Sequence, residues 1–113
     1  GQAKITPAFN LPCKYVIHTV GPIVSGRLTK MHCNELSDCY WSCLKLAADS
    51  GLKSIAFCCI STGVFHFPQN KAAEIAVQTV QDYLKEDDRI ERVVFNVFKE
   101  EDYSIYRRLL GYR

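Results

Sequence analysis

Several features that would fix the class of this 113-residue protein at once are absent from its sequence. No apolar run approaches the roughly 20 residues that span a bilayer, and no signal-peptide pattern opens the chain. The formal net charge of +2 is too small to indicate a nucleic-acid or membrane partner. No low-complexity tract interrupts a composition that is 48% hydrophobic and 23% charged. We therefore expect one folded domain in the cytoplasm, with no nucleic-acid and no membrane partner.

The sequence also lacks a secretory signal, the usual setting of a disulfide framework, although it contains six cysteines. They are Cys13, Cys33, Cys39, Cys43, Cys58 and Cys59. Cys39 and Cys43 lie one helical turn apart within an apolar stripe, which indicates core positions rather than a reactive site. Together with His32 and Cys33 they match no familiar zinc-binding spacing, so we expect reduced thiols and no metal ion here.

Strand and helix patterns alternate along the chain. Strands are predicted at 3–6, 15–20, 54–60 and 92–98, and helices at 35–50, 72–83 and 101–110. Asn34 is the candidate N-cap of the first helix, Gly51 is its stop, and 23–33 reads as a loop. This alternation predicts an α/β fold with a mainly parallel sheet and helices on its faces.

One strand-to-helix connection has the features of a ligand loop. The segment CCISTGVFHFPQNKAAEIA (58–76) leaves an apolar strand through small residues and then enters a helix. Ligands of open parallel sheets bind beyond the carboxyl ends of the strands, and Gly63 permits close approach of the backbone. Free N–H groups and the helix dipole favour a phosphate, while Phe65 and Phe67 can wall a sugar or base. The pattern is neither G-x-G-x-x-G nor a P-loop, so a simple connector remains the alternative.

Four stretches in order resemble the C-terminal half of a macrodomain, over residues 1 to about 110. They are KYVIHTVGP (14–22), SIAFCCISTGVFHFP (54–68), AAEIAVQTV (72–80) and VVFNVFKEEDYSIYRRLL (93–110). His66 stands where most macrodomains have glycine, which resembles the zinc-dependent microbial subgroup. That subgroup is associated with sirtuin-type ADP-ribosyltransferases and with modification of lipoyl-carrier proteins.

The resemblance implies a three-layer α/β/α fold and a site for ADP-ribose. It also implies hydrolytic removal of ADP-ribose from mono-ADP-ribosylated proteins or from O-acetyl-ADP-ribose. By position, the residues that match the loop around the diphosphate and distal ribose are Ser61, Thr62, Gly63, Val64 and Phe65. Phe98 matches the aromatic residue that stacks on adenine. Two alternatives remain: a reader of ADP-ribose that does not cleave it, and an unrelated nucleotide-binding α/β protein.

The family's first half has no counterpart in this sequence. The catalytic loop, the acidic residue that reads adenine and the zinc cluster of the subgroup would all precede Gly1. We therefore expect a partial macrodomain that is inactive alone, with its catalytic residues unknown and zinc bound only by a full-length parent. The family sheet also places an early strand between the strands that match 14–20 and 54–60. Without it, the exposed edges predict either a strand-exchanged homo-oligomer or direct pairing of these two strands.

Several aromatic and histidine residues are interpreted as structural. His18 lies in a strand pattern and is expected to be a hydrogen-bonded core residue rather than a general base. His66 either faces the ligand or fills the space that glycine would leave. Trp41 and the pair Tyr103 and Tyr106 are expected to pack in the core or a groove.

Overall fold

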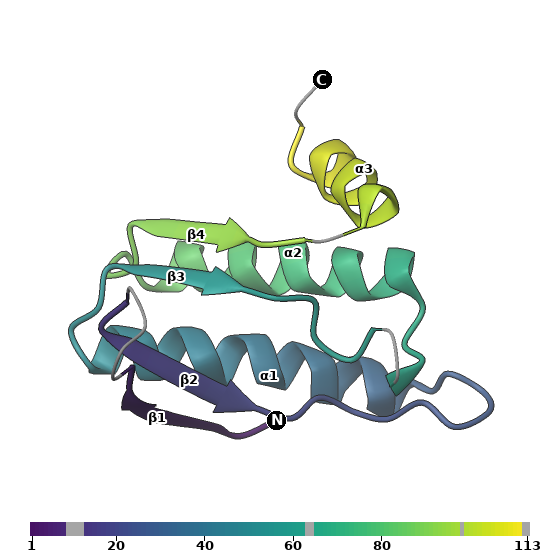
Figure 1. The fold of residues 1–113 in the computed structure, drawn as a ribbon, viewed down its shortest axis with the longest axis horizontal. Coiled ribbons are helices and arrows are strands. Elements are labelled where there is room, and N and C mark those ends of the chain that lie inside the picture. The colour runs from purple at the N-terminus through teal and green to yellow at the C-terminus, as the bar shows by residue number, and fades with distance from the viewer. Residues whose placement is uncertain (9–12, 63–64, 98, 112–113) are drawn as a thin grey trace.

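Strands and helices alternate in the computed structural model, which confirms the α/β class (Figure 1). The structure describes residues 1–8, 13–62, 65–97 and 99–111. In chain order the elements are β1 (Ala3–Pro7), β2 (Tyr15–Thr19), α1 (Lys30–Asp49), β3 (Ser54–Phe57), α2 (Gln69–Glu86), β4 (Arg92–Phe95) and α3 (Glu100–Leu109). Every predicted strand and helix is present, and both long strands predicted to reach Ile60 and Phe98 end earlier.

The strands form two separate pairs rather than one mainly parallel sheet. β1 and β2 pair antiparallel, with Ile5 opposite Ile17, because a short connection can join only antiparallel neighbours. β3 and β4 pair parallel, with Ile55 opposite Val93, because α2 supplies the crossover between them. Within the described residues no ladder joins β2 to β3, so the prediction that these two strands pair directly is wrong. The predicted open edges are present.

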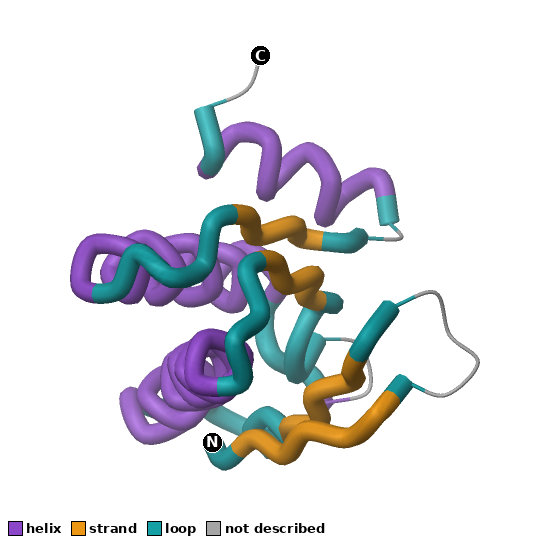
Figure 2. Tube along the Cα trace, turned by 90° about the vertical axis from the view of Figure 1, so that its left-hand side faces the viewer, coloured by secondary structure: helices purple, strands orange, loops and turns teal. Residues whose placement is uncertain are grey.

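The helices cover one face of the strands. Figures 1 and 2 show α1 and α2 on the same side of the strands, behind them in Figure 1 and to their left in Figure 2, while α3 lies beyond β4. On the other face Ala56 and Val94 are exposed, and among the described residues no helix covers them. Parallel strands are usually covered on both faces. In the part of the chain that the structure describes, α1 and α2 therefore cover one face of the strands and leave this face open.

The first helix begins one turn and a half earlier than predicted. Its N-cap is Thr29 rather than Asn34, and residues 30–34 are helical instead of belonging to a loop. The Thr29 hydroxyl accepts from the His32 N–H at 3.3 Å, and His32 Nδ1 accepts from the Thr29 N–H at 3.1 Å. This reciprocal pair is a capping box in which histidine replaces the usual Glu or Gln. The predicted stop is confirmed, since Gly51 has a φ of +77°.

The core lies between α1, α2 and the β3–β4 pair. Leu36, Cys39 and Leu44 of α1 are fully buried, and Cys43 is 3% exposed, so the predicted cysteine stripe is confirmed. Burial raises the pKa of the Cys43 thiol to about 12, which keeps it protonated and unreactive. Across the helix pair the Ser37 and Thr79 hydroxyls are 2.9 Å apart.

An aromatic row continues the core toward α3. The Tyr40 ring lies 4.9 Å from Phe57, which is followed at 6.2 Å by Phe95 and at a further 4.9 Å by Tyr106. Trp41 packs edge-on against Tyr83 at 4.9 Å, as expected for a packing residue. None of the described helices is both long enough and apolar enough to span a membrane.

Candidate functional site

The loop between β3 and α2 carries the residues predicted to hold a ligand. Ser61, Thr62 and Phe65 lie in its described part, on the side where β3 ends. Gly63, Val64 and Phe98 lie outside the described residues, so their predicted roles stay predictions. The early end of β3 at Phe57 leaves ten residues, 58–67, between the strand and the N-cap of α2.

Ser61 has an unusual backbone and an unpaired hydroxyl. Its φ is +65°, a region that residues with a side chain seldom occupy. The side chain is buried, and its Oγ has no hydrogen-bond partner among the described residues. The Ser61 carbonyl accepts from the Phe67 N–H at 3.0 Å, which closes the loop on itself. Strain combined with an unsatisfied group is typical of a functional site.

Two residues of the preceding segment, which sequence reasoning did not single out, contact this loop. The Val24 N–H donates to the Phe65 carbonyl at 2.9 Å. Gly21 is buried against Ser61, so closely that an added Cβ would lie 2.0 Å from Ser61 Oγ. The signal that could have found them is the Gly21-Pro22 pair directly after the strand predicted at 15–20.

His66 also has a left-handed backbone, with a φ of +62°, and its side chain is exposed. A glycine would occupy this conformation without strain, whereas a histidine does so at a cost. The exposed ring does not fill a buried gap. Phe67, the next residue, is 2% exposed and anchors the loop in the core, so it is not free to wall a sugar or base as predicted.

The start of α2 provides an electropositive end beside the loop. Its N-cap is Pro68, which has no N–H and makes no side-chain cap, so the N–H groups of the first turn keep their capacity to bind an anion. The first turn contains Lys71 and no acidic residue. The helix dipole and the Lys71 charge both favour a negatively charged group at this end.

The other histidine differs from its prediction. His18 is exposed, and its Nε2 lies 2.9 Å from the Thr6 hydroxyl on the neighbouring strand. It is therefore hydrogen-bonded as expected but is not in the core. The reason is the two-residue period of β2: Ile17 packs toward the helices, so His18 points to the uncovered face.

The two tyrosines of α3 differ in exposure. Tyr106 is buried, as predicted, whereas Tyr103 is 53% exposed, and the Arg107 guanidinium carbon lies 6.0 Å from the Tyr103 ring centre. Cys59 lies within the β3–α2 loop, and burial raises the pKa of its thiol. Among the described residues no group of three or more His, Cys, Asp or Glu side chains could hold a metal ion.

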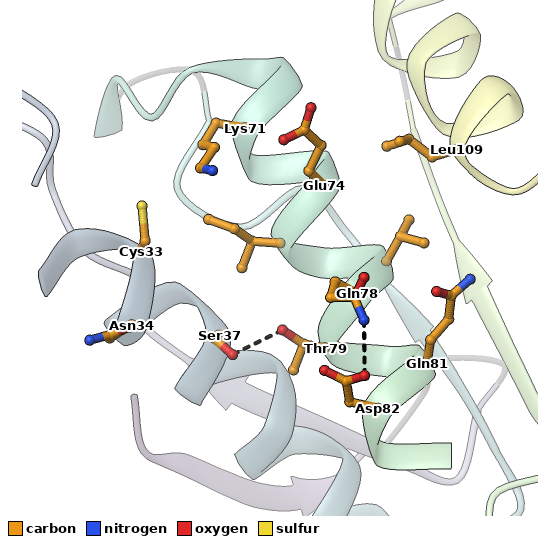
Figure 3. A pocket seen from close by; sticks show the side chains of 12 residues that line it. Cys33, Asn34, Ser37, Lys71, Glu74, Gln78, Thr79, Gln81, Asp82 and Leu109 are labelled. Carbon is orange, nitrogen blue, oxygen red and sulfur yellow. Dashed lines mark hydrogen bonds between the residues drawn. The ribbon is translucent and has the colours of Figure 1, made fainter. Parts of the chain in front are cut away.

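A hollow of about 580 Å³ lies elsewhere, between α1 and α2 (Figure 3). Its lining is mostly polar and includes Asn34, Lys71, Glu74 and Gln78, with Cys33 at one end. None of the described loop residues lines it. Because the strained and unsatisfied groups are in the loop, we take the loop rather than this hollow as the candidate site.

Comparison with known proteins identifies a consistent set of relatives. The model of the family described as Macro domain matches residues 1–76. A curated relative from Treponema medium, named Protein-ADP-ribose hydrolase, is 63% identical over 111 residues, covering 98% of this chain and 42% of the relative. The Oceanobacillus iheyensis macrodomain with ADP superposes with a TM-score of 0.90 at 41% identity, covering 97% of this chain and 57% of that one. The Trypanosoma brucei macrodomain in complex with ADP-ribose gives a TM-score of 0.87 at 37% identity, covering 96% and 45%. The chain thus spans about two fifths of the length of the curated relative.

Proposed function

Because this chain belongs to the Macro domain family, we propose that a protein carrying it binds ADP-ribose and removes it from modified proteins by hydrolysis. O-acetyl-ADP-ribose is the second substrate that this chemistry admits. The observation that carries the proposal is the 63% identity to the relative named Protein-ADP-ribose hydrolase. With a modified protein, the bond between the anomeric carbon of the distal ribose and the acceptor group breaks, water supplies a hydroxyl to that carbon, and the acceptor group takes the remaining proton. With O-acetyl-ADP-ribose, the ester bond breaks instead: the hydroxyl of water goes to the acetyl carbonyl carbon and the proton to the ribose oxygen, which releases acetic acid. No further reactant is required.

In this proposal the loop from Ser61 to Phe65 holds the diphosphate and distal ribose, and Phe98 stacks on adenine. The uncapped start of α2 supports this placement because it favours a bound anion, and the strained Ser61 backbone supports it because such strain is typical of a ligand site. Lys71 in the first turn of α2 adds a positive charge at the same end. Binding and orientation are therefore the roles assigned to this chain.

We place the catalytic residues and any zinc ligands in the part of the relatives' length that this chain does not span. The described residues do not fit a zinc ion, since they bring no three ligands together. No step of the reaction is therefore routed through a metal here. Zinc content of a longer protein, measured with and without chelator treatment, tests the zinc-dependent assignment. A cytoplasmic location and a mono-ADP-ribosylated lipoyl-carrier protein as one acceptor belong to the same proposal.

Calorimetric titration of ADP-ribose tests the binding step. We would titrate the 113-residue chain and a longer protein carrying it, with ATP and NAD as competing ligands. Saturable binding of ADP-ribose in preference to ATP and NAD is expected for the longer protein. Preference for ATP or NAD would contradict the assignment and favour a different nucleotide-binding protein. Binding by both proteins would place most of the affinity in the loop.

The second candidate is a reader that binds ADP-ribosylated proteins without cleaving them. The Trypanosoma brucei relative whose structure contains ADP-ribose favours it, because binding alone accounts for that complex. The two candidates differ in turnover. Release of ADP-ribose from a mono-ADP-ribosylated protein by catalytic amounts of the longer protein supports the hydrolase, and stoichiometric binding without release supports the reader.

Self-association belongs to the proposal as well. The unpaired β2 and β3 edges give two copies of this chain a route to strand exchange. We expect a solution mass above that of one chain for the 113-residue protein, measured by light scattering. A mass equal to one chain of 12.9 kDa would contradict it.

A further inference from the structure

The segment after β2 holds the candidate loop at two points. The Val24 N–H donates to the Phe65 carbonyl at 2.9 Å, and Val24 itself is 6% exposed. Three residues earlier, buried Gly21 packs directly on Ser61. Residues 21–24 are called the brace below. The brace therefore contacts the loop at Ser61 and at Phe65.

Gly21 is required for steric reasons rather than conformational ones. A Cβ at this position would lie 2.0 Å from Ser61 Oγ, 2.6 Å from Ile60 Cγ2 and 3.2 Å from Ser61 Cβ. Gly21 is not among the described residues with positive φ, so its backbone would accept another residue. Only a hydrogen atom fits between the brace and the loop. Any side chain at residue 21 must displace Ser61, Ile60 or the brace itself.

Ser61 needs such support because its own conformation is costly. A φ of +65° is unfavourable for serine, and its buried hydroxyl lacks a partner among the described residues. Such a conformation persists only where the surrounding structure imposes it. The close packing of Gly21 on one side and the Phe67 N–H bond to the Ser61 carbonyl on the other supply this constraint.

We propose that Gly21 is a positioning residue for ADP-ribose binding, because its bare backbone lets the brace fix Ser61 and Phe65 before the ligand arrives. The proposal rests on the function proposed above. A loop that is already ordered loses less conformational entropy on binding, so the brace strengthens affinity without touching the ligand. Gly21 acts through Ser61, and Val24 acts through the Phe65 carbonyl.

The test is a pair of substitutions with a built-in rescue. Gly21→Ala should weaken ADP-ribose binding by about tenfold or more, since a small misplacement of a binding group is costly. Ser61→Gly removes the two Ser61 atoms nearest to the new methyl group and suits the positive φ. The double variant Gly21→Ala/Ser61→Gly should therefore bind about threefold or more tightly than Gly21→Ala alone, the remaining contact with Ile60 limiting recovery.

Gly26→Ala is the matched control. Gly26 lies five residues after Gly21, and an added Cβ there would have no atom within 4 Å. Alanine at residue 26 still lowers stability, because the φ of +80° strains any residue with a side chain. It should lower stability and leave ADP-ribose affinity unchanged. An equal loss of affinity in both alanine variants would overturn the proposal, because general destabilisation would then explain the effect.

Hydrogen exchange separates failure of this inference from failure of the proposed function. Gly21→Ala should speed exchange of the Phe67 and Val24 amides, whose hydrogen bonds define the loop and the brace, and Ser61→Gly should slow it again in the double variant. This measurement needs no ligand, so it tests whether Gly21 orders the loop even if ADP-ribose does not bind. Unchanged exchange rates in Gly21→Ala would overturn the proposal that the brace fixes the loop.

If Gly21→Ala does not fold, the double variant Gly21→Ala/Ser61→Gly is compared with Ser61→Gly alone, so that any contact of the Ser61 side chain with the ligand is absent from both proteins. The Ile60 contact still displaces the brace in the double variant, which should therefore bind ADP-ribose more weakly than Ser61→Gly. Equal affinity of these two variants would overturn the proposal.

Discussion

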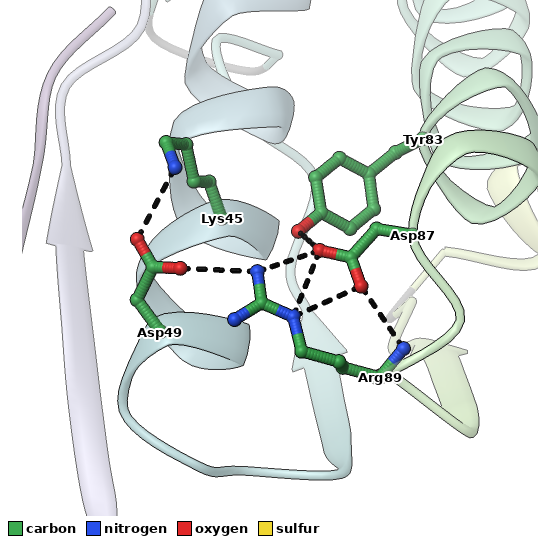
Figure 4. A network of polar contacts seen from close by, with 5 residues as sticks. All are labelled: Lys45, Asp49, Tyr83, Asp87 and Arg89. Carbon is green, nitrogen blue, oxygen red and sulfur yellow. Dashed lines mark hydrogen bonds and ion pairs between the residues drawn. The ribbon is translucent and has the colours of Figure 1, made fainter.

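Arg89 reaches from the turn before β4 to Asp49 at the end of α1, with Nη2 3.0 Å from Oδ1 (Figure 4). The same guanidinium binds both carboxylate oxygens of Asp87, at 2.7 to 3.1 Å. Tyr83 of α2 donates its hydroxyl to Asp87 at 2.7 Å, and Lys45 lies 3.3 Å from Asp49. This network ties the C-terminal ends of α1 and α2 to the turn that leads into β4.

Removing Arg89 should destabilise the protein slightly. Arg89→Ala is expected to lower the thermal midpoint by less than about 5 °C, because partly exposed ion pairs contribute little individually and this group joins two carboxylates. The loss should shrink as salt is added. Calorimetry at low and high salt measures it. Lys53→Ala is the control, because the Lys53–Glu91 pair is exposed and 3.9 Å apart; an equal loss there would contradict the network's importance.

Acid should weaken the protein partly through Asp87. Hydrogen bonds from Arg89 and then from Tyr83 hold the pKa of the Asp87 carboxyl far below its usual value. The folded state therefore keeps this charge at a pH where the unfolded chain, with a pKa of about 3.9, binds a proton. The contribution of the Asp87 charge to stability is present above about pH 4 and is lost as the pH falls further.

Urea unfolding between about pH 6 and pH 3 should show a shallower decline for Asp87→Asn than for the unmodified protein. The exposed neighbour variant Asp88→Asn serves as control and should follow the unmodified protein. Parallel declines for all three proteins would be evidence against the role of Asp87.

Alkaline pH should weaken the protein partly through Tyr106. Burial, followed by the nearby Cys59 thiol, raises the pKa of Tyr106 to about 12. The folded state then retains a proton that the unfolded chain begins to lose near about pH 10, so stability falls as the pH rises above that value. Tyr106→Phe keeps the ring stacked on Phe95 and should flatten this decline in urea unfolding. Tyr103→Phe, at a ring that is 53% exposed, should leave it unchanged; a flattening by both variants would count against a specific role of Tyr106.

At residue 66 glycine should give a more stable protein than alanine, in contrast with most positions. Because His66 has a φ of +62°, His66→Gly should be more stable than His66→Ala by about 1 kcal/mol. In the first turn of α2 the order should reverse, with Asn70→Ala more stable than Asn70→Gly. Denaturant unfolding of the four variants measures both differences. The same order at both positions would show that backbone conformation does not decide the effect at His66.

Local signals in the sequence predicted much of the fold. The 3.6-residue period located α2, and Gly51 marked the end of α1, because both depend on residues close in the chain. The start of α1 was mispredicted because His32 is an uncommon partner in a capping box, so Thr29 went unrecognised. Strand pairing was also mispredicted, since it depends on contacts between distant segments.

In the candidate site, too, local features were predictable from the sequence and long-range contacts were not. Small residues and a following helix located the loop, and the resemblance assigned Ser61 and Phe65 to it. The contact between Gly21 and Ser61 could not be predicted, because forty residues separate them and no local pattern couples them. The exposure of His18 was missed for a related reason: alternation gives two faces to a strand, and only the tertiary arrangement decides which face is covered.

The separation of the strands into two pairs has a consequence for how the molecule opens. α1 contacts β1, β2 and β3, whereas no backbone ladder joins the two pairs among the described residues. Cooperativity between them must therefore pass through the side chains of α1 and through the contacts of residues 21–24 with the loop after β3. The β1–β2 hairpin can then detach as a sub-global unit while the β3–α2–β4 crossover stays folded, and two classes of amide protection would record the two units.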